Sequence, residues 1–452
     1  MNRFLGLFPP VIRDAAVTAA SSRLQWTRRS GEYGLWQRRY REWRHLSLED
    51  SLRLQQKRLE ELLRYAADNS PFYRTRLQRL SPLSLRDIPI LEKADLQANI
   101  DQIVVGAKSK LVPCFTGGTT GKGITVYSRK QDLQQRFAIL NLFWETHGFR
   151  FGRDKVAWFS GRDLLSDGDV QRGLFWRNNW LYKTRYYSTF HMSQEHLGAY
   201  VKDLCGFRPS FLSGFPSSIT ELARFIKTGR ASLPFRPKAI FVTSETLTLG
   251  QRETMEGVFG CKVRNQYCAS EGAPFIVECA CGNLHLDLTT GVVEVVDENG
   301  RAADEGEMLV TPFFVTGTPI IRYRIGDRIR MSDQRRCGCG WDTPIVDAIQ
   351  GRASDYIEVP GRGKIFCTQI GDCVKGVSTV LKFQVEMCDN ALHVDLVADP
   401  QAFAANDKDT FLHKVHERMG EVPVVFHFVE DIPRAPSGKH TVVKQRPTAA
   451  KR

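Results

Sequence analysis

Hydrophobic residues recur at helical spacing near the start of the chain. Between residues 47 and 68, leucines occur at spacings that place them on one face of a helix, with Glu49 and Asp50 early and Arg64 late. This pattern predicts an amphipathic helix, because acidic side chains favour the amino end of a helix and basic side chains its carboxyl end. We therefore expect the opening of the chain to be helical.

From about residue 104 to residue 345, short runs of β-branched and aromatic residues alternate with longer helical patterns. The strand-like runs are KVAWFS, SFLSGF, KAIFVTSE and KVRNQYCAS, and the helical pattern SSITELARFIKTGR stands between the second and the third. Strands that alternate with helices predict an α/β domain with largely parallel sheets.

The pattern changes after Gly291, where two strand-like runs flank an Asp-Glu-Asn-Gly turn and predict a β-rich subdomain. From Gly351 on, the runs FQVEM, LHVDLVA and VVFHFVE predict the strands of a small α+β domain. The predicted fold class is α/β, with a large N-terminal domain of parallel-type sheets and a β-rich subdomain, plus a small mobile α+β C-terminal domain. The expected parts are a helical extension over 1–100, a core over 101–350 and the small domain over 351–452.

The composition is that of an ordinary globular protein, since 42% of the 452 residues are hydrophobic and 25% are charged. Pro9, Pro10, Arg13 and Asp14 interrupt any signal-peptide core, and no apolar run approaches membrane-spanning length. We therefore expect a cytoplasmic protein without a transmembrane segment. The sequence leaves the oligomeric state open.

The chain carries a formal charge of +13, and much of the excess lies in the first ninety residues, as in RRSGEYGLWQRRYREWRHL. Such an excess is compatible with nucleic acid, acidic lipid or anionic substrates as partners. No recognisable nucleic-acid module accompanies it, so we expect no nucleic-acid partner. Two interpretations stay open: a solvated basic helix face, and peripheral contact with a membrane surface or a partner.

Residues 114–127 read CFTGGTTGKGITVY and are the first candidate for chemistry. Glycines let backbone N–H groups turn towards an anion, threonine hydroxyls add donors, and the lysine adds positive charge, which together suit a triphosphate. The spacing differs from that of the P-loop. A Gly-rich turn with a purely structural role is the alternative.

This loop resembles the signature phosphate loop of the adenylate-forming enzymes, and six further segments resemble motifs of that superfamily in the same order. They are SGFPSSI (213–219), TSETL (243–247), NQYCASE (265–271), RYRIGD (322–327), GRASDYI (351–357) and PRAPSGKHTVVK (433–444). Over residues 65–444 the series is similar to the phenylacetate–CoA ligase-like branch, which includes capsular polysaccharide biosynthesis and coenzyme F390 synthetase-like proteins. The core over 101–350 would then be an AMP-binding core.

The resemblance implies a role for five residues. A lysine at the position of Lys439 bridges the substrate carboxylate and the α-phosphate in this superfamily, so Lys439 is the expected catalytic lysine. Glu271 matches the catalytic residue that holds Mg²⁺ on the phosphates, as a hard oxygen ligand can. Asp327 and Arg352 match contacts to the ribose, and Tyr267 matches the aromatic residue that stacks on adenine. The alternative is a surface lysine for Lys439, a turn cap for Asp327, an ion pair for Arg352 and a core residue for Tyr267.

The resemblance also assigns residues to nucleotide binding, to the acyl pocket and to a hinge. The nucleotide group adds Thr116, Gly117, Gly118, Thr119, Thr120, Gly121, Lys122, Ser244, Glu245, Thr246 and Gln266; the pocket group is Ser213, Gly214, Phe215 and Pro216; the hinge is Ser354 or Asp355. Ser354 stands where the family usually has Asp or Lys, which leaves the hinge assigned to either residue. Cys367 stands where members often carry a proline that concerns the second half-reaction, so the pattern supports adenylation more firmly than thioester formation.

Eleven cysteines, an odd number, do not follow the spacings of a disulfide framework. Five soft or borderline donors lie in ECACGNLH (278–285) and CGCGW (337–341), and a sulfur-rich tetrahedral set suits structural Zn²⁺. Some members of the branch carry a Cys, a His six residues later and then C-x-C. The ligands implied by this resemblance are Cys279, His285, Cys337 and Cys339, with Cys281 as the alternate. Unliganded buried thiols are the other interpretation.

The predicted reaction joins a carboxylic acid to ATP, giving an acyl-adenylate and pyrophosphate, and then transfers the acyl group, with CoA as the expected acceptor. The expected cofactors are ATP, Mg²⁺, CoA and structural Zn²⁺. Trp158, Phe211 and Phe215 favour an aromatic or otherwise apolar small-molecule acid. Two alternatives remain: an adenylating enzyme of surface-polysaccharide synthesis with a non-CoA biosynthetic acceptor, and a degenerate zinc-containing binding protein.

Overall fold

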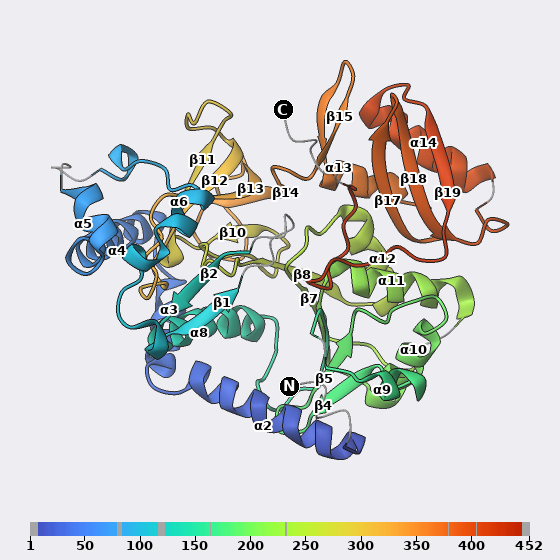
Figure 1. The fold of residues 1–452 in the computed structure, drawn as a ribbon, viewed down its shortest axis with the longest axis horizontal. Coiled ribbons are helices and arrows are strands. Elements are labelled where there is room, and N and C mark those ends of the chain that lie inside the picture. The colour runs from blue at the N-terminus through green and yellow to red at the C-terminus, as the bar shows by residue number, and fades with distance from the viewer. Residues whose placement is uncertain are drawn as a thin grey trace. The chain divides into compact units, whose positions relative to one another are not determined.

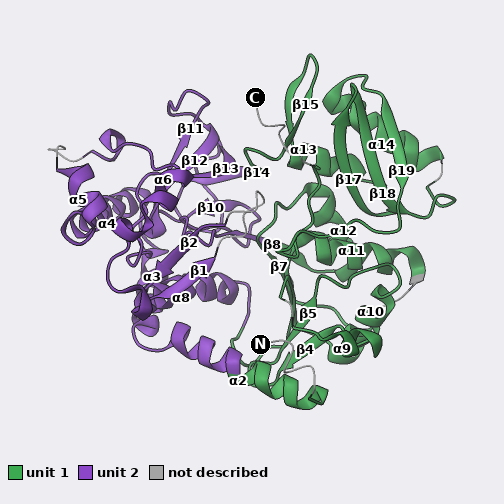
Figure 2. Cartoon of the chain, in the orientation of Figure 1, with its two compact units in different colours: residues 1–19, 150–263, 350–452 green, residues 20–149, 264–349 purple. Residues whose placement is uncertain are grey.

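The computed structural model describes residues 8–78, 84–115, 123–162, 164–230, 233–377, 379–403 and 405–444. Its internal contacts divide the chain into two compact units, shown as ribbons in Figures 1 and 2. Unit 1 comprises residues 1–19, 150–263 and 350–452, and unit 2 comprises residues 20–149 and 264–349. Each unit therefore combines segments that are far apart in the sequence.

Unit 1 contains a mainly parallel sheet. Its strands are β3 (Val156–Ser160), β4 (Trp176–Asn179), β5 (Thr184–Ser188), β6 (Phe211–Gly214) and β7 (Ala239–Val242). Strand β3 pairs with β5 and β6, and β6 pairs with β7, all in parallel, while β4 is an antiparallel edge strand. Parallel strands covered on both faces are nearly continuous apolar runs, and the strands predicted at KVAWFS, SFLSGF and KAIFVTSE are confirmed.

Three helices share an apolar core with this sheet: α10 (Leu197–Phe207), α11 (Pro216–Phe225) and α12 (Leu249–Phe259). Helix α11 confirms the predicted helical pattern and begins at a proline, which suits the first turn of a helix. Helix α12 opens with a capping box, because the Thr248 hydroxyl accepts a hydrogen bond from the Gln251 N–H at 3.2 Å and the Gln251 side chain accepts one from the Thr248 N–H at 3.1 Å.

Buried charges attach the first described residues to unit 1. Helix α2 (Pro10–Arg29) places Arg13 against Asp169, which also pairs with Arg177 of β4. Arg177 Nε in turn lies 3.9 Å from a carboxylate oxygen of Asp14. Because a buried charge is costly unless it is paired, this network fixes the start of α2 on the edge of the sheet.

The last part of unit 1 is a small α+β domain, as predicted for the fold class. It contains β15 (Tyr356–Val359), β16 (Gly363–Phe366), α13 (Cys367–Gly371), β17 (Val380–Cys388), β18 (Ala391–Ala398), α14 (Ala405–Met419) and β19 (Val424–Phe428). Strands β17 and β18 form an antiparallel pair, and β19 joins β18 in parallel after the crossover helix α14. The three strands predicted in this region are confirmed.

Unit 2 is dominated by antiparallel strands. They are β8 (Lys262–Tyr267), β9 (Ile276–Glu278), β10 (Leu284–Leu286), β11 (Gly291–Val296), β12 (Glu305–Pro312), β13 (Tyr323–Met331) and β14 (Ile345–Arg352), and the ends of β8 and β14 extend into unit 1. The predicted turn between β11 and β12 is confirmed, with the Asp297 carboxylate accepting from the Asn299 and Arg301 N–H groups at 2.8 and 2.9 Å. Antiparallel pairing already begins at β8 and β9, before Gly291. The parallel sheet expected across residues 104–345 is wrong for this part, because the turn between β9 and β10 is too short for a parallel crossover.

Helix α4 (Leu48–Asn69) confirms the predicted amphipathic helix. The Ser47 hydroxyl caps it by accepting from the Asp50 N–H at 3.1 Å, and Leu59, Leu62 and Leu63 are buried. The other elements are α3 (Tyr33–Trp43), α5 (Pro71–Leu77), η1 (Leu85–Asp87), α6 (Lys93–Ala98), α7 (Ile100–Ile103), η2 (Lys108–Lys110), β1 (Val112–Phe115), β2 (Thr125–Ser128), α8 (Lys130–Thr146), α9 (Asp167–Gln171), η3 (Ile226–Arg230), η4 (Leu288–Thr290) and η5 (Asp372–Val374).

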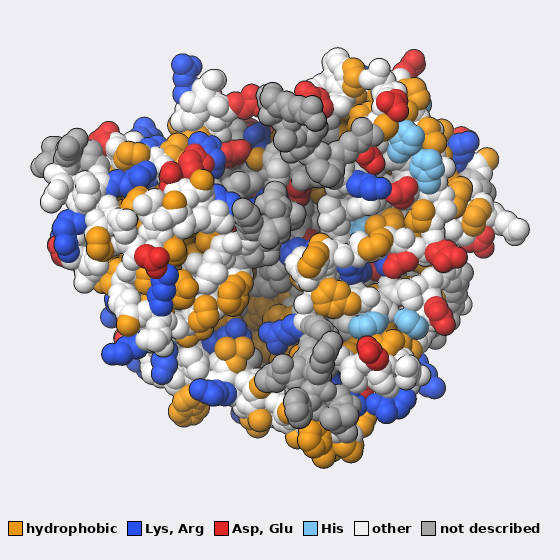
Figure 3. Space-filling view, viewed as in Figure 1, with side chains coloured by type: hydrophobic (Ala, Val, Ile, Leu, Met, Phe, Trp, Pro, Cys, Tyr) orange, Lys and Arg blue, Asp and Glu red, His pale blue; other side chains and the backbone are white. Residues whose placement is uncertain are grey.

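Within the described ranges, no helix combines the length and the apolarity that crossing a membrane requires. On the face shown in Figure 3, basic and acidic side chains are interspersed. The described side chains on that face therefore mix both signs of charge.

Candidate functional site

The predicted phosphate loop connects two paired strands of unit 2. Strands β1 and β2 are antiparallel, with Phe115 opposite Thr125. The Thr318 hydroxyl accepts from the Tyr127 N–H at 2.8 Å and donates to the Tyr127 carbonyl at 3.0 Å, which anchors β2. The seven predicted loop residues, Thr116, Gly117, Gly118, Thr119, Thr120, Gly121 and Lys122, lie outside the described residues.

The segment that ends in Glu271 is held by helix α8. Arg136 donates to the carbonyl oxygens of Ala269 and Ser270 at 2.7 and 3.3 Å, and the Trp144 indole N–H donates to the Gln266 side chain at 3.1 Å. Gly272 follows with φ +92°, where an added Cβ would come within 2.1 Å of a Val315 methyl group. This close approach and the Arg136 contacts fix the backbone around Glu271, whose side chain is buried.

Two of the predicted nucleotide-binding residues meet in unit 2. The Tyr267 hydroxyl at the end of β8 donates to the Asp327 carboxylate on β13 at 2.7 Å. A hydrogen bond to an ionised group is stronger than a neutral one, so this contact fixes the orientation of the Tyr267 ring. The structure thus joins two residues that the sequence predicted separately, sixty positions apart.

The predicted acyl-pocket segment lies at the carboxyl end of β6 in unit 1. Gly214 has φ +145°, and a Cβ there would come within 2.0 Å of the Phe159 carbonyl oxygen of the neighbouring strand β3. Ser213 and Phe215 are buried, and Pro216 begins α11. The carboxyl ends of parallel strands are the usual place for ligands in open α/β sheets, which agrees with the predicted position of the pocket.

Glu245 connects this segment with the lysine loop, which we define as residues 433–440. Its carboxylate accepts from the Ser217 N–H at 3.0 Å, from the Ser217 hydroxyl at 3.1 Å and from the His440 N–H at 2.9 Å. The preceding residue, Ser244, adopts φ +72°, a strained conformation for a residue other than glycine. The resemblance placed Ser244 and Glu245 in the nucleotide site; the structure places the Glu245 side chain on protein partners.

The predicted hinge lies against Thr246, which follows Glu245. Gly351 has φ +87°, and a Cβ there would come within 2.8 Å of the Thr246 hydroxyl. The next residues form a turn in which the Asp355 N–H donates to the Arg352 carbonyl at 3.0 Å and the Ser354 hydroxyl donates to the Asp355 carboxylate at 3.2 Å. Both hinge candidates therefore belong to one short turn that follows the glycine.

Cys367 lies next to this turn, and its N–H donates to the Asp355 carbonyl at 2.9 Å. Burial, followed by the negative charges of Asp355 and Glu245, raises the pKa of the Cys367 thiol to about 12. The side chain is therefore a neutral thiol at physiological pH, so it is not activated as a nucleophile.

The backbone on both sides of Lys439 is fixed within unit 1. The Ala435 N–H donates to the Lys439 carbonyl at 2.9 Å, and the Gly438 N–H donates to the Ala435 carbonyl at 2.7 Å. Gly438 has φ +78°, and a Cβ there would come within 2.4 Å of the Gly161 Cα atom at the end of β3. The lysine loop therefore packs backbone against backbone on Gly161, directly after β3.

The four predicted metal ligands meet in unit 2. The candidate ligand atoms of Cys279, His285, Cys337 and Cys339 all lie within 4.8 Å of one another. Cys279 Sγ lies 3.6 Å from Cys337 Sγ, and Cys339 Sγ lies 3.4 Å from His285 Nε2. A tetrahedral zinc ion with ordinary bond lengths separates its ligands by about 3.8 Å for two sulfurs and about 3.6 Å for sulfur and nitrogen, so the cluster fits this ion.

Neighbouring groups orient these side chains. His285 Nδ1 lies 3.1 Å from the Thr343 hydroxyl, which leaves Nε2 facing the sulfurs. Burial, followed by the positive charge of Arg44, lowers the pKa of His285 to about 4, so the imidazole is neutral, the form that binds a metal. Cys281, the predicted alternate, is exposed and stays outside the group.

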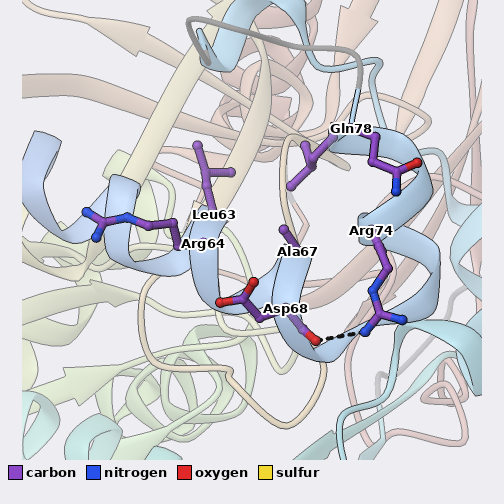
Figure 4. A pocket seen from close by; sticks show the side chains of 7 residues that line it. Leu63, Arg64, Ala67, Asp68, Arg74 and Gln78 are labelled. Carbon is purple, nitrogen blue, oxygen red and sulfur yellow. Dashed lines mark hydrogen bonds between the residues drawn. The ribbon is translucent and has the colours of Figure 1, made fainter.

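A surface hollow of about 610 Å³ lies between α4 and α5 of unit 2. Figure 4 shows Arg74 donating to the Asp68 carbonyl at its rim, a bond of 2.8 Å. Its lining residues are Leu63, Arg64, Ala67, Asp68, Arg74, Leu77 and Gln78, none of which the sequence predicted for the site.

Comparison with known proteins identifies relatives along most of the chain. Protein CapK of Staphylococcus aureus is 32% identical over 401 residues, which cover 86% of this chain and 88% of that protein. Phenylacetate-coenzyme A ligases of Thermus thermophilus and Escherichia coli K12 are 26% and 24% identical, each over 70% of this chain and over 73% and 74% of their own lengths. Residues 357–446 match the CapK C-terminal domain.

Solved structures share the fold. A crystal structure of 2-hydroxyisobutyryl-CoA ligase in the postadenylation state has a TM-score of 0.69 at 19% identity, over 89% of this chain and 91% of that chain. An anthranilate CoA ligase structure has a TM-score of 0.52 at 14% identity, over 74% of this chain and 66% of that chain. The chain has the fold of the adenylate-forming CoA ligases, and its sequence is related to the phenylacetate–CoA ligase-like branch of that superfamily. Within that branch, the chain belongs to the CapK family.

Sequence reasoning missed the partners of the lysine loop. Ser217 and Glu221 of α11 contact it through Arg434, which the motif contains but the resemblance leaves without a role. One signal was available: Glu221 and Arg224 are the charged residues of a helix whose other residues are uncharged and whose side chains are largely buried. Charged residues on a buried face are rarely unpaired, which points to partners elsewhere in the chain.

Proposed function

We propose that this protein activates a small carboxylic acid with ATP, releasing pyrophosphate and forming an acyl-adenylate, and then transfers the acyl group to CoA. One observation carries the proposal: Glu245 binds both His440 of the lysine loop and Ser217, the residue directly after the pocket segment. Lys439 is thereby held next to the carboxyl end of β6, where an acid substrate would bind.

Lys439 would supply the charge that adenylation needs. A carboxylate that attacks the α-phosphorus brings two anions together, so an ammonium group between them lowers the barrier. The fixed backbone on both sides of Lys439 limits the entropy that the side chain loses in reaching them. When the carboxylate oxygen bonds to phosphorus, the bond to pyrophosphate breaks, and the electron pair leaves with pyrophosphate.

Tyr267, Asp327 and Arg352 would bind the nucleoside. A carboxylate can accept several hydrogen bonds, so the bond from Tyr267 to Asp327 is compatible with acceptance from ribose hydroxyls. The fixed Tyr267 ring suits stacking on adenine. Glu271 would hold Mg²⁺, which neutralises phosphate charge when bound.

A second candidate function keeps adenylation and changes the acceptor to an amine, a sugar or a carrier protein of surface-polysaccharide synthesis. Two observations favour it. The most extensive likeness among these relatives is to CapK rather than to a named CoA ligase. By the resemblance, Cys367 also stands where a proline that concerns the second half-reaction is often found, and its backbone N–H donates to the Asp355 carbonyl of the hinge turn.

We also propose that Cys279, His285, Cys337 and Cys339 hold a structural Zn²⁺. Four protein ligands leave no open coordination position, which excludes a catalytic role for the ion in this site. Cys279 lies in the turn after β9, His285 lies in β10, and the other two ligands come from the segment before β14, so the ion would join two parts of the β-rich subdomain.

The test of the proposed function is acid-dependent pyrophosphate release from ATP and Mg²⁺ over a panel of aryl, fatty, hydroxy and amino acids, with and without CoA. Lys439→Ala is expected to abolish release. Lys408→Ala removes an exposed lysine from α14 of the same domain and should leave release unchanged. Faster turnover with CoA supports the ligase, while acid-dependent release that CoA does not accelerate supports another acceptor. If the wild-type protein releases no pyrophosphate with any acid of the panel, the proposed adenylation is contradicted.

A further inference from the structure

A buried carboxylate on α11 pairs with two cations from the C-terminal domain. Glu221 Oε2 accepts from Arg434 at 2.6 Å, and Glu221 Oε1 lies 3.0 Å from Lys382 Nζ. The exposed fraction of the side chain is 3% for Glu221, 5% for Arg434 and 6% for Lys382. They come from a helix of the 150–263 segment, from the lysine loop and from β17, and we call them the charge clamp.

Further contacts attach the clamp to its surroundings. Lys382 Nζ also donates to Asp431 at 2.6 Å and to the Met192 carbonyl at 2.9 Å. Arg224, one turn after Glu221 on the same helix, donates to the Leu381 carbonyl at 3.1 Å. The clamp therefore holds β17 and the lysine loop together on one face of α11.

The clamp reaches the backbone of Lys439 from both sides. Arg434 donates to the Ser217 hydroxyl at 3.2 Å and lies 3.5 Å from the Gly438 carbonyl, just before Lys439. On the other side, the His440 N–H donates to Glu245 and the His440 ring donates to the Phe383 carbonyl at 2.8 Å. A shift of Arg434 would therefore move the residue that precedes the catalytic lysine.

We propose that Glu221, through Arg434 and Lys382, is a positioning residue that holds the lysine loop for the adenylation step and has no part in the acyl-transfer step. The inference rests on the proposed function, because it presumes that Lys439 acts in the first half-reaction. Expected rotation at the hinge turn would separate α11 from the lysine loop between the two steps. The ion pairs exist only while the two are in contact, so they favour the adenylating arrangement.

The chemistry of the clamp distinguishes this role from general packing. Removal of one partner of a buried ion pair leaves an uncompensated charge, so the contact itself becomes unfavourable. In a Glu221→Gln variant, Arg434 would lose its buried counter-charge and would lower its free energy by moving into water, so the lysine loop would leave its place, while Lys382 would keep its contact with Asp431. A misplacement of about 1 Å can lower a rate about 100-fold, and this effect would fall on adenylation alone.

The experiment measures the two half-reactions separately, with the acid that gives the strongest pyrophosphate release in the panel. Adenylation is followed as acid-dependent ATP–pyrophosphate exchange. Acyl transfer is followed as consumption of the chemically synthesised acyl-adenylate in the presence of CoA. Glu221→Gln is the main variant, and Glu417→Gln, which removes a carboxylate from an exposed ion pair in the same domain, is its matched control.

Glu221→Gln is expected to lose about 100-fold in exchange and to retain the wild-type rate of acyl transfer. Equal losses in both steps, or no loss in either, would overturn the inference. If Glu221→Gln does not fold, Arg434→Lys keeps the positive charge and loses the forked contact to Glu221 and Ser217, and the same split between the half-reactions is expected. A wild-type protein without exchange activity would instead contradict the proposed function.

Discussion

Substitution of Gly161 by alanine tests whether the close contact between β3 and the lysine loop matters for catalysis. A Cβ at residue 161 would lie 2.0 Å from the Ser437 carbonyl oxygen, and real Cβ atoms essentially never come closer than 3.0 Å to another heavy atom. The backbone of the lysine loop must therefore move by at least 1 Å. Gly161 has no positive φ, so the substitution acts through this contact and not through strain at residue 161 itself.

The size of the effect follows from that movement. A displacement of about 1 Å can lower a rate about 100-fold, which corresponds to about 2.7 kcal/mol of transition-state stabilisation. ATP–pyrophosphate exchange measures the loss directly, and a thermal unfolding curve shows whether the protein is still folded. Gly161→Ala should remain folded, because the residues that must move, 433–440, lie outside the helices and strands.

Gly206→Ala is the matched control. It makes the same change within helix α10 of the same unit, where an added Cβ meets nothing within 4 Å. Alanine is favoured over glycine in a helix by about 1 kcal/mol, so this variant should keep its exchange rate and gain stability. Wild-type exchange in Gly161→Ala, or an equal loss in both variants, would refute the reasoning.

Three further predictions concern other parts of the two units. Cys337→Ser should lower bound zinc, measured by metal analysis of the purified protein, from about one equivalent to about zero, while Cys281→Ser should retain it. Burial, followed by the positive charge of Arg434, lowers the pKa of His440 to about 4, below its value in the unfolded chain. The free energy of unfolding should therefore fall by up to about 3 kcal/mol as the pH drops from about 6.5 towards 4. Urea unfolding of His440→Gln should lack this part of the pH dependence. Tyr267→Phe removes the hydroxyl that binds Asp327. It should raise the KM for ATP about fivefold, which corresponds to about 1 kcal/mol of binding free energy, and change kcat little.

Each of these predictions has a result that contradicts it. Equal zinc contents in the two cysteine variants would remove Cys337 from the site. Identical pH dependence in wild type and His440→Gln would mean that His440 titrates normally. An unchanged KM for ATP in Tyr267→Phe would separate the Tyr267–Asp327 contact from nucleotide binding.

The order of apolar and polar residues along the chain was enough to predict buried strands and an amphipathic helix. Strands β6 and β7 are buried on both faces and β3 is largely buried, so their apolar runs identify them without knowledge of their neighbours. Helix α4 has one apolar stripe and a cap, both of which are local signals. Antiparallel pairing of β9 with β10 was not anticipated because it depends on a five-residue turn that also carries the cysteines.

Long-range pairs explain why the candidate site was only partly predictable. The motif series placed Tyr267 and Asp327 in one group, and the structure joins them. Glu221 and Arg434 are 213 positions apart, and neither position carries a pattern that names the other. The nucleotide role of Glu245 stays a prediction, since its carboxylate is bound to Ser217 and His440.

The charge clamp has a consequence for solubility during turnover. If the proposed hinge rotation separates α11 from the lysine loop, both faces of this contact are exposed to water each time it opens. If those faces were apolar, every opening would expose a hydrophobic surface to which other protein molecules could bind. Glu221, Arg434 and Lys382 are instead groups that water solvates well once they part. A contact made from charges can therefore be released many times in a crowded solution without inviting aggregation.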